Sequence, residues 1–133
     1  MSYTIEKGKR FITADSGCFS YMGRIDFDDP AHPVFAWPAT CADVEFTGTS
    51  AAVAMRNVSF NSDTHFAVIV DGVMKKITLP QDGDEELYTA AEGLPEGRHT
   101  LRILKTMAAY NYLVFGGIVV DEGAQVSAPK REY

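Results

Sequence analysis

The chain has 133 residues, 46% of them hydrophobic and 23% charged, a balance that suits one domain with a packed core and excludes an intrinsically disordered chain. Its 18 acidic and 12 basic side chains give a formal net charge of −6, which makes nucleic acid backbones and anionic membrane surfaces poor partners. No apolar run approaches the roughly 20 residues that span a bilayer, and the N-terminal residues lack the apolar segment of a secretory signal. We therefore expect a cytoplasmic protein, a secreted one whose signal has been removed, or part of a longer chain.

Alternation of apolar and polar residues with period two dominates the sequence, and this period places side chains on the two faces of a strand in turn. In chain order it predicts strands near residues 3–6, 19–25, 34–37, 41–47, 50–57, 64–71, 73–79, 86–91, 97–105 and 113–121. Helical periodicity is weak, since only the segment 107–109 is compatible with a helical turn. Many short strands separated by turns predict an all-β fold, a jelly-roll β-sandwich of about 8–10 strands in which residues 1–133 form a single domain.

Two pairs of residues allow more specific predictions. Asp71-Gly72 separates two alternating runs and is typical of a two-residue hairpin turn with positive φ. Gly116-Gly117 interrupts the last long apolar strand. Paired glycines inside a strand indicate a bulge or the close approach of another backbone.

The cysteines and the acidic clusters do not predict a metal or cofactor site. Cys18 and Cys41 form either one disulfide or, as we favour, two separate thiols in the core, and together with His32 they lack the spacing of a zinc site. The acidic turn at 82–86 and the aspartates of 26–29 lack the ligand spacing of an EF-hand loop. We interpret them as solvated turns, although a jelly roll can hold a structural calcium ion, and we predict no cofactor.

Hydrolysis by a nucleophile needs an activated Ser or Cys, a histidine base and usually an acid that orients the histidine. His65 and His99 lie in predicted strands, where a structural or exposed role is expected. His32 lies in a loop shortly after Asp29, with the spacing of the acid–base pair of GDSL-type esterases, but no Gly-Asp-Ser nucleophile motif precedes it. We assign no catalytic residue to this chain.

Aromatic residues give the strongest indication of a binding site. Trp37 lies in a loop-like stretch beside Pro38, and Tyr110, Asn111 and Tyr112 form a polar aromatic cluster. Sugars present C–H faces that stack on aromatic rings, while their hydroxyl groups bond to amides and acids. These aromatic residues, together with Asn111, are the predicted carbohydrate-binding site. The alternative that stays open is that Trp37 closes one end of the core and that both tyrosines begin a strand.

Several short motifs occur in an order that resembles one known family. They are Gly23-Arg24, Trp37-Pro38, the F-x-G-T-S hairpin at Phe46–Ser50, the V-x-V-D-G hairpin at Val68–Gly72 and the G-x-H-x-L strand at Gly97–Leu101. In this order the motifs resemble the N-terminal jelly-roll domain of carbohydrate esterase family 2, and the match covers nearly the whole chain. Each motif alone occurs in many sandwiches, so the order and spacing carry the resemblance.

The resemblance implies a galactose-binding-like, carbohydrate-binding-module architecture. It also implies that an SGNH-type hydrolase domain follows in the same polypeptide and removes acetyl groups from plant polysaccharides or sugars. The chain would then be a non-catalytic accessory domain, and its partners would be the hydrolase domain and an acetylated polysaccharide or oligosaccharide.

Two other functions are compatible with the sequence. The first is a docking or oligomerisation domain without a ligand, which would present an apolar strand face such as Gly116–Val120 to a partner. The second is a small stand-alone esterase that uses His32 and Asp29.

Overall fold

The computed structural model describes residues 4–23, 25–35, 40–59, 64–79, 84–105 and 111–129. Within these ranges the chain forms strands and turns without a helix, so it contains no helix there that could cross a membrane. The strands in chain order are β1 (Lys9–Thr13), β2 (Ser20–Met22), β3 (Ile25–Asp26), β4 (Val34–Phe35), β5 (Cys41–Thr47), β6 (Ala51–Ser59), β7 (Thr64–Val70), β8 (Val73–Leu79), β9 (Glu86–Ala91), β10 (Arg98–Lys105), β11 (Asn111–Asp121) and β12 (Val126–Ser127).

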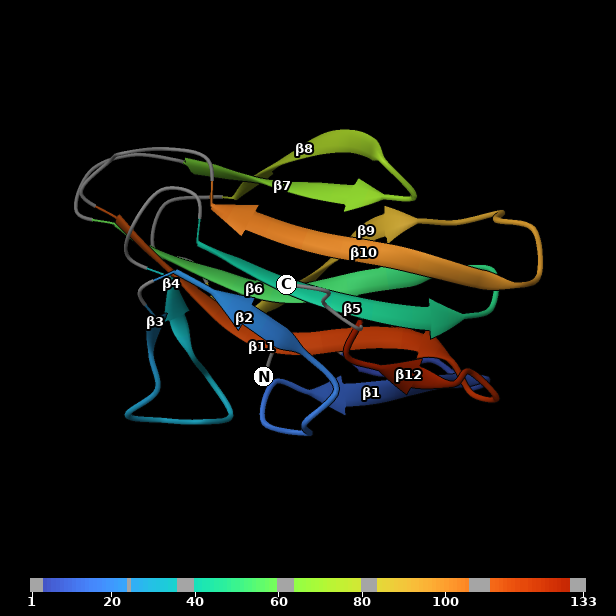
Figure 1. Cartoon of the computed structure of the whole chain (residues 1–133). Helices are drawn as coiled ribbons and strands as arrows, with labels where there is room; N and C mark the ends of the chain where they lie inside the picture. Colours follow the sequence, from blue (N-terminus) through green and yellow to red (C-terminus); the bar gives the residue numbers. More distant parts are fainter. Residues whose placement is uncertain are drawn as a thin grey trace.

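These strands form two antiparallel sheets that pack face to face (Figure 1). The β11 sheet has the order β3-β4-β11-β6-β9, and β1 also pairs with β11. The β10 sheet has the order β12-β5-β10-β7-β8, and β2 also pairs with β5. Most connections between β5 and β11 cross from one sheet to the other. The predicted all-β jelly-roll sandwich is therefore confirmed.

The core lies between the sheets because alternate side chains of each strand point inward. Val53 and Met55 of β6 and Ile118 of β11 face Leu101 and Ile103 of β10 across this layer, and all of these side chains are fully or almost fully buried. Removing a side chain of this size from water stabilises the fold by about 1.5–3 kcal/mol. The period-two pattern of the sequence thus reports directly on which face is buried.

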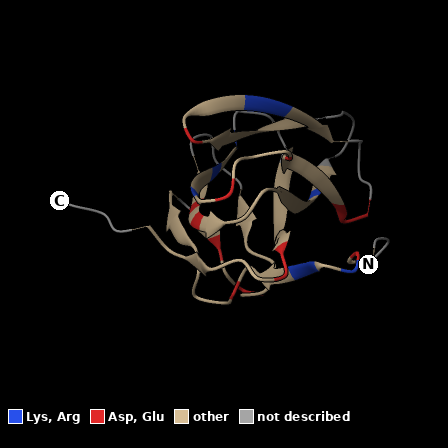
Figure 2. Ribbon diagram, turned by 90° about the vertical axis from the view of Figure 1, so that its right-hand side faces the viewer, with Lys and Arg blue, Asp and Glu red and all other residues tan. Residues whose placement is uncertain are grey.

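The sandwich has two ends, at which the strands begin and finish. At the turn end, on the right of Figure 1 and facing the viewer in Figure 2, short connections join the strands. These connections are the turns at 48–50, 71–72 and 92–97. At the opposite end of the sandwich, the loop end, four described segments end, at Phe35, Ser59, Leu79 and Lys105.

Most predicted strand positions agree with the structure, and those of β5, β8 and β9 agree at both ends. The predicted strand at 3–6 is wrong over residues 4–6, which are not in a strand, and β1, which begins only at Lys9, was not predicted. Lys9 pairs with Asp121, where β11 ends. Residues 4–6 therefore lie beyond the end of the strand that would have to pair with them.

Two short strands divide the predicted segment 19–25, and a further short strand was not predicted. β2 and β3 are separated at Gly23, which has a φ of 97°. A Cβ atom at this glycine would come within 2.9 Å of the Thr40 hydroxyl oxygen. β12, of two residues, pairs with β5 after the last long strand, and a segment this short has no readable alternation.

The glycine pair in β11 forms the predicted bulge. The register with β6 shifts between Phe115 and Gly117, so Gly116 has no opposite residue. Gly117 has a φ of 135°, and a Cβ atom there would lie 2.1 Å from the carbonyl oxygen of Ile12 in β1. Both predicted features, a bulge and the close approach of another backbone, are confirmed.

The apolar face proposed for docking at Gly116–Val120 is not available. All five residues are buried, with Ile118 and Val120 in the core between the sheets. Val119 points to the other side of β11, where Phe11 of β1 pairs with it. The apolar character of this segment thus reflects burial on both faces rather than a surface for a partner.

A buried histidine holds the turn end together. Asp71 and Gly72 adopt positive φ values of 50° and 86° in the predicted hairpin turn. The carboxylate of Asp71 lies 2.6 Å from Nδ1 of His99 and also accepts a hydrogen bond from the amide of Thr100. Nε2 of His99 lies 2.8 Å from the carbonyl oxygen of Pro95. Both ring nitrogens face acceptors, and the hydrogen bond to Asp71 raises the pKa of His99 above its ordinary value.

Candidate functional site

Of the predicted carbohydrate-binding residues, the structure describes Tyr112 and the backbone of Asn111. Trp37 and Tyr110 lie outside the described residues, as does the side chain of Asn111. The backbone of Asn111 begins β11 and pairs with Ser59. Tyr112 follows it opposite Val58, and its side chain is 47% exposed. The structure therefore places one predicted aromatic ring on a paired strand with its surface open to solvent.

Tyr112 lies close to the point where the chain leaves β4 toward Trp37. Phe35, the last residue of β4, pairs with Leu113, the neighbour of Tyr112. Phe35 and Leu113 both point into the core and are almost completely buried. The alternation of β11 then directs Tyr112 to the outer face of the sheet. The end of β4, the end of β6 and the start of β11 are thus paired side by side at this tyrosine.

Buried polar side chains lie behind this edge, and the sequence analysis missed them. Thr40, Asn57 and Lys105 are each at most 1% exposed. Lys105 follows Leu101 and Ile103 at the same spacing of two residues, so the alternation of β10 could have predicted that its side chain points inward. Its backbone amide donates a hydrogen bond to the carbonyl of Thr40, and burial lowers the pKa of its ammonium group. The interior of the sandwich therefore becomes polar at the loop end.

The alternative catalytic pair, His32 and Asp29, does form, but in an arrangement that does not suit hydrolysis. Nδ1 of His32 lies 3.2 Å from a carboxylate oxygen of Asp29. Nε2 lies 3.5 Å from a carboxylate oxygen of Glu85, which comes from the segment before β9. A general base needs one ring nitrogen directed at the nucleophile. In the described contacts both nitrogens of His32 are directed at carboxylates.

Two aspartates of the acidic group at 26–29 bond to the local backbone. Asp26 accepts a hydrogen bond from the amide of Asp28, and Asp29 accepts one from the amide of Ala31. Such contacts are typical of aspartates that stabilise turns. Across the described ranges, no group of three or more His, Cys, Asp or Glu side chains is arranged to hold a metal ion. Asp82, in the second acidic turn, lies outside those ranges.

The two cysteines are separate thiols, in agreement with the favoured prediction. Cys41 is buried in β5, and Cys18 is partly buried against the core. Neither belongs to an arrangement with His32, which lies in the loop between β3 and β4. Their role in the fold is packing.

Comparison with known proteins places these observations in a family. The family model described as carbohydrate esterase 2 N-terminal matches residues 21–129. The cellulase/esterase CelE of Acetivibrio thermocellus is 32% identical over 114 residues, which are 83% of this chain and 13% of CelE. The chain therefore spans only a small part of this relative.

Two solved structures show the extent of the similarity. A family two carbohydrate esterase from Clostridium thermocellum, in complex with cellohexaose, has 30% identity and a TM-score of 0.72, over 84% of this chain and 34% of that one. A family 35 carbohydrate-binding module from an environmental isolate has 14% identity and a TM-score of 0.68, over 91% of this chain and 99% of the module. The second comparison shows a shared fold. Because the family model covers most of the sequence, the chain belongs to the carbohydrate esterase 2 N-terminal family.

Proposed function

We propose that the chain is the non-catalytic, carbohydrate-binding accessory domain of a carbohydrate esterase, with its glycan site at the loop end. Residues 1–133 would be the N-terminal part of a longer enzyme, and an SGNH-type hydrolase domain would supply the catalytic residues. Tyr112 is the observation that carries this proposal, because it is an exposed aromatic ring on a firmly paired strand. Trp37, Tyr110 and Asn111 would complete the site.

The position of Tyr112 suits the recognition of a sugar. An aromatic ring stacks on the C–H face of a sugar and loses little conformational entropy when its backbone is already fixed. Pairing with β6 on one side and the β4 contact at Leu113 on the other fix the start of β11. The structure of the Clostridium thermocellum esterase was determined in complex with cellohexaose. This supports a glucan or a related β-linked glycan as a probe.

A titration tests the site directly. Acetylated xylo-oligosaccharides, manno-oligosaccharides and cellohexaose are added to the 133-residue chain, and heat or amide chemical shifts are recorded. We expect Tyr112→Ala and Trp37→Ala to weaken binding about tenfold, the loss of one stacking contact of ~1.4 kcal/mol. Phe27→Ala is the matched control, because Phe27 is 45% exposed against 47% for Tyr112 and lies outside the loop end. Unchanged binding in both loop-end variants would refute the site assignment.

An ester-hydrolysis assay tests the non-catalytic part of the proposal. The chain should not release acetate from 4-nitrophenyl acetate or acetylated xylan above the rate of buffer. The contact of both His32 nitrogens with carboxylates is the physical reason. Turnover that disappears in His32→Ala would show instead that the chain is an esterase itself.

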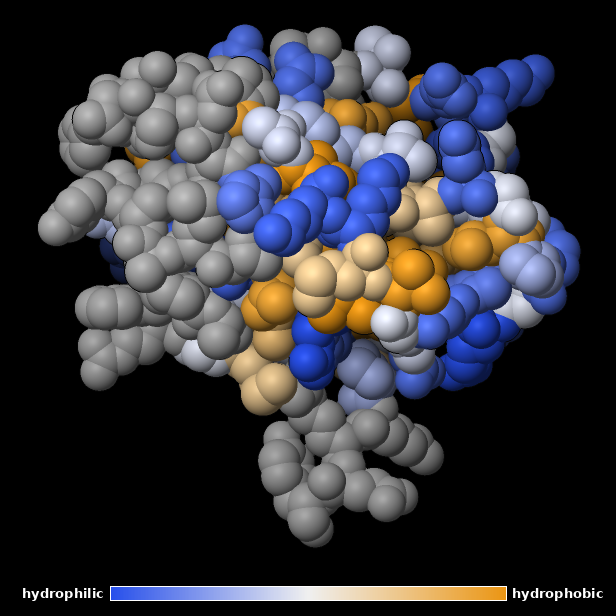
Figure 3. Space-filling view, turned by 90° about the horizontal axis from the view of Figure 1, so that it is seen from above, coloured by the Kyte–Doolittle hydropathy of each residue, from blue (hydrophilic) through white to orange (hydrophobic). Residues whose placement is uncertain are grey.

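A docking role has one specific observation in its favour. Val73 and Met74, at the start of the edge strand β8, are 72% and 56% exposed. Seen from the β8 side, hydrophobic groups reach the surface among hydrophilic ones (Figure 3). Light scattering with and without a purified SGNH-type domain tests this role. Complex formation that Val73→Ser and Met74→Ser abolish together would favour docking through β8.

A further inference from the structure

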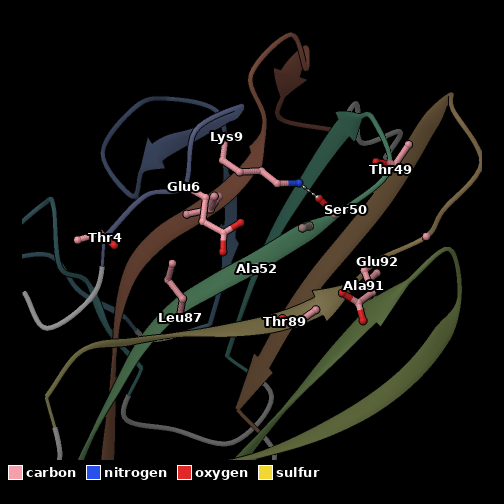
Figure 4. Close-up of a pocket in the computed structure, with 13 residues that line it drawn as sticks. Thr4, Glu6, Lys9, Thr49, Ser50, Ala52, Leu87, Thr89, Ala91 and Glu92 are labelled. Carbon is pink, nitrogen blue, oxygen red and sulfur yellow. Dashed lines mark hydrogen bonds between the residues drawn. The ribbon is translucent and has the colours of Figure 1, made fainter.

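A groove of about 480 Å³ opens at the turn end, on the outer face of the β11 sheet. The N-terminal segment forms one wall and the end of β9 forms the other, with β6 between them (Figure 4). The residues that line it are Thr4, Glu6, Lys9, Thr49, Ser50, Ala51, Ala52, Leu87, Thr89, Ala91, Glu92, Gly93 and Val119. Its volume is within the ordinary range of small-ligand sites.

A charged network fixes the wall formed by the N-terminal segment. The ammonium group of Lys9 lies 2.8 Å from the carboxylate of Asp121 and donates a hydrogen bond of 2.6 Å to the hydroxyl of Ser50. Asp121 also accepts hydrogen bonds from the amide and the hydroxyl of Thr49. Lys9 above all, and then the Thr49 amide, hold the pKa of Asp121 well below its ordinary value. The amide of Glu122 donates to the carbonyl of Gly8 and closes the same wall.

The opposite wall is attached to the same turn. The amide of Leu94 donates a hydrogen bond of 2.9 Å to the carbonyl of Thr49. On the far side of β9, the ammonium group of Lys75 donates to the carbonyl of Thr89. The two walls are therefore both joined to the chain around Thr49, and the groove is preformed rather than assembled on binding.

The floor and the rim of the groove differ in chemistry. The floor consists of small or aliphatic side chains, Ala52, Leu87 and Val119, because Ala51 points into the core on the other face of β6. The groove is open there because β6 carries alanine where a larger residue would fill the space. The rim carries hydroxyl groups, from Thr4, Thr49, Ser50 and Thr89. An apolar floor beneath a ring of hydrogen-bonding groups matches a sugar, which has C–H faces and hydroxyl edges.

The charges of the groove select a neutral ligand that donates hydrogen bonds. Lys9 is committed to Asp121. Glu6 and Glu92 are exposed, lie on opposite sides of the groove (Figure 4), and have no ion pair among the described residues. Carboxylates accept charge-assisted hydrogen bonds from hydroxyl groups and repel anions. Acidic and basic residues both occur at the turn end (Figure 2), so it is the two carboxylates of the groove itself that disfavour phosphate, sulfate and uronate groups.

We propose that this groove is a second saccharide site, for one or two rings of a neutral glycan. The proposal rests on the proposed function, since it assumes that the domain binds glycan at all. Glu6 and Glu92 would accept hydrogen bonds from sugar hydroxyls, and Ala52 would lie beneath the ring.

The test is an amide chemical-shift titration of the 133-residue chain with cellotetraose, xylotetraose and mannotetraose. The proposal expects shifts for Glu6–Lys9 and Thr89–Gly93 with at least one of them. Glu92→Gln should weaken the sugar binding measured at these amides by about tenfold, because it removes one charge-assisted hydrogen bond. Ala52→Leu should abolish it by filling the floor. Glu96→Gln is the control, since Glu96 is an exposed carboxylate nearby that does not line the groove.

Each outcome decides between the two proposals. Shifts confined to the loop end around Tyr112 would overturn the second site and leave the proposed function standing. No shift anywhere with any of the three sugars would overturn both. Binding of an oligogalacturonate in preference to the neutral sugars would contradict the charge argument. If Ala52→Leu lost its β-sheet circular dichroism, Glu6→Gln combined with Glu92→Gln would decide, because both carboxylates are exposed and neither supports the fold.

Discussion

Gly117→Ala tests the pairing of β1 with β11 at the glycine bulge. Gly117 has a φ of 135°, and an added Cβ would lie 2.1 Å from the carbonyl oxygen of Ile12. Nonbonded carbon and oxygen atoms approach to only about 3.3 Å. The alanine variant must therefore push β1 away by about 1 Å, or distort the bulge.

The expected loss can be estimated from its parts. A non-glycine residue held in this region of φ costs about 1–3 kcal/mol. Separation of β1 weakens the pairing of Ile12 and Thr13 with β11, and each lost backbone hydrogen bond costs about 1 kcal/mol. Together these terms predict a loss of about 3–5 kcal/mol in the free energy of unfolding. For a chain of this size that lowers Tm by roughly 10–20 °C.

Thermal and urea unfolding, followed by far-ultraviolet circular dichroism, measure this loss. Gly123→Ala is the matched control, because Gly123 has no positive φ and no atom within 4 Å of an added Cβ. Its effect should stay within about 0.5 kcal/mol. If Gly117→Ala is as stable as the parent, or no less stable than Gly123→Ala, the close approach of β1 and the bulge are placed incorrectly.

Three further predictions concern stability. Because the folded state raises the pKa of His99, its charged form stabilises the fold by about 1–2 kcal/mol below the ordinary pKa of 6.5. This stabilisation is lost as the pH rises through the raised pKa. Urea unfolding at several pH values should show this loss of stability in the parent and not in His99→Gln. Arg102→Met should lower the free energy of unfolding by about 1–2 kcal/mol, since it removes two hydrogen bonds from the largely buried carboxylate of Asp43. Arg98→Met is the control at an exposed ion pair and should lower it by less than about 0.5 kcal/mol. A reducing agent should leave Tm unchanged, because the two cysteines are separate thiols.

The fold was largely predictable because the buried faces repeat with the period of a strand. Leu101 and Ile103 of β10 illustrate this, since they alternate with charged or polar residues in the sequence and both are buried in the structure. The turn at Asp71-Gly72 and the bulge at Gly116-Gly117 were predictable for another reason. Each requires a backbone conformation or a closeness that glycine permits.

The polar contacts were not predictable because they join residues that are distant in the sequence. Glu85, just before β9, reaches His32, just before β4, although the two are distant in sequence, because β4 and β9 belong to the same sheet. Lys9 and Asp121 meet because β1 pairs with β11, the last long strand, rather than with its neighbour in sequence. Order along the chain carries no information about such pairs until the sheet order is known. The groove was missed for the same reason.

The two proposed glycan sites lie on one face, and this has a consequence for ligand length. Tyr112 is opposite Val58, and Val119, in the groove, is opposite Ala52 on the same strand. Six residues of extended β6 separate these two positions, which is roughly 20 Å. An oligosaccharide that spans this distance would bind both sites at once, so its second contact would be intramolecular.

Affinity should therefore rise in a step with ligand length rather than gradually. Short cello- or xylo-oligosaccharides would occupy the two sites independently and weakly, whereas a longer one would bind at least about 100-fold more tightly. Calorimetry over a series of lengths shows the step. Both Tyr112→Ala and Glu92→Gln should return the long ligand to the affinity of a short one. A gradual increase that neither variant changes would mean that the sites do not act on one chain, even if each binds sugar.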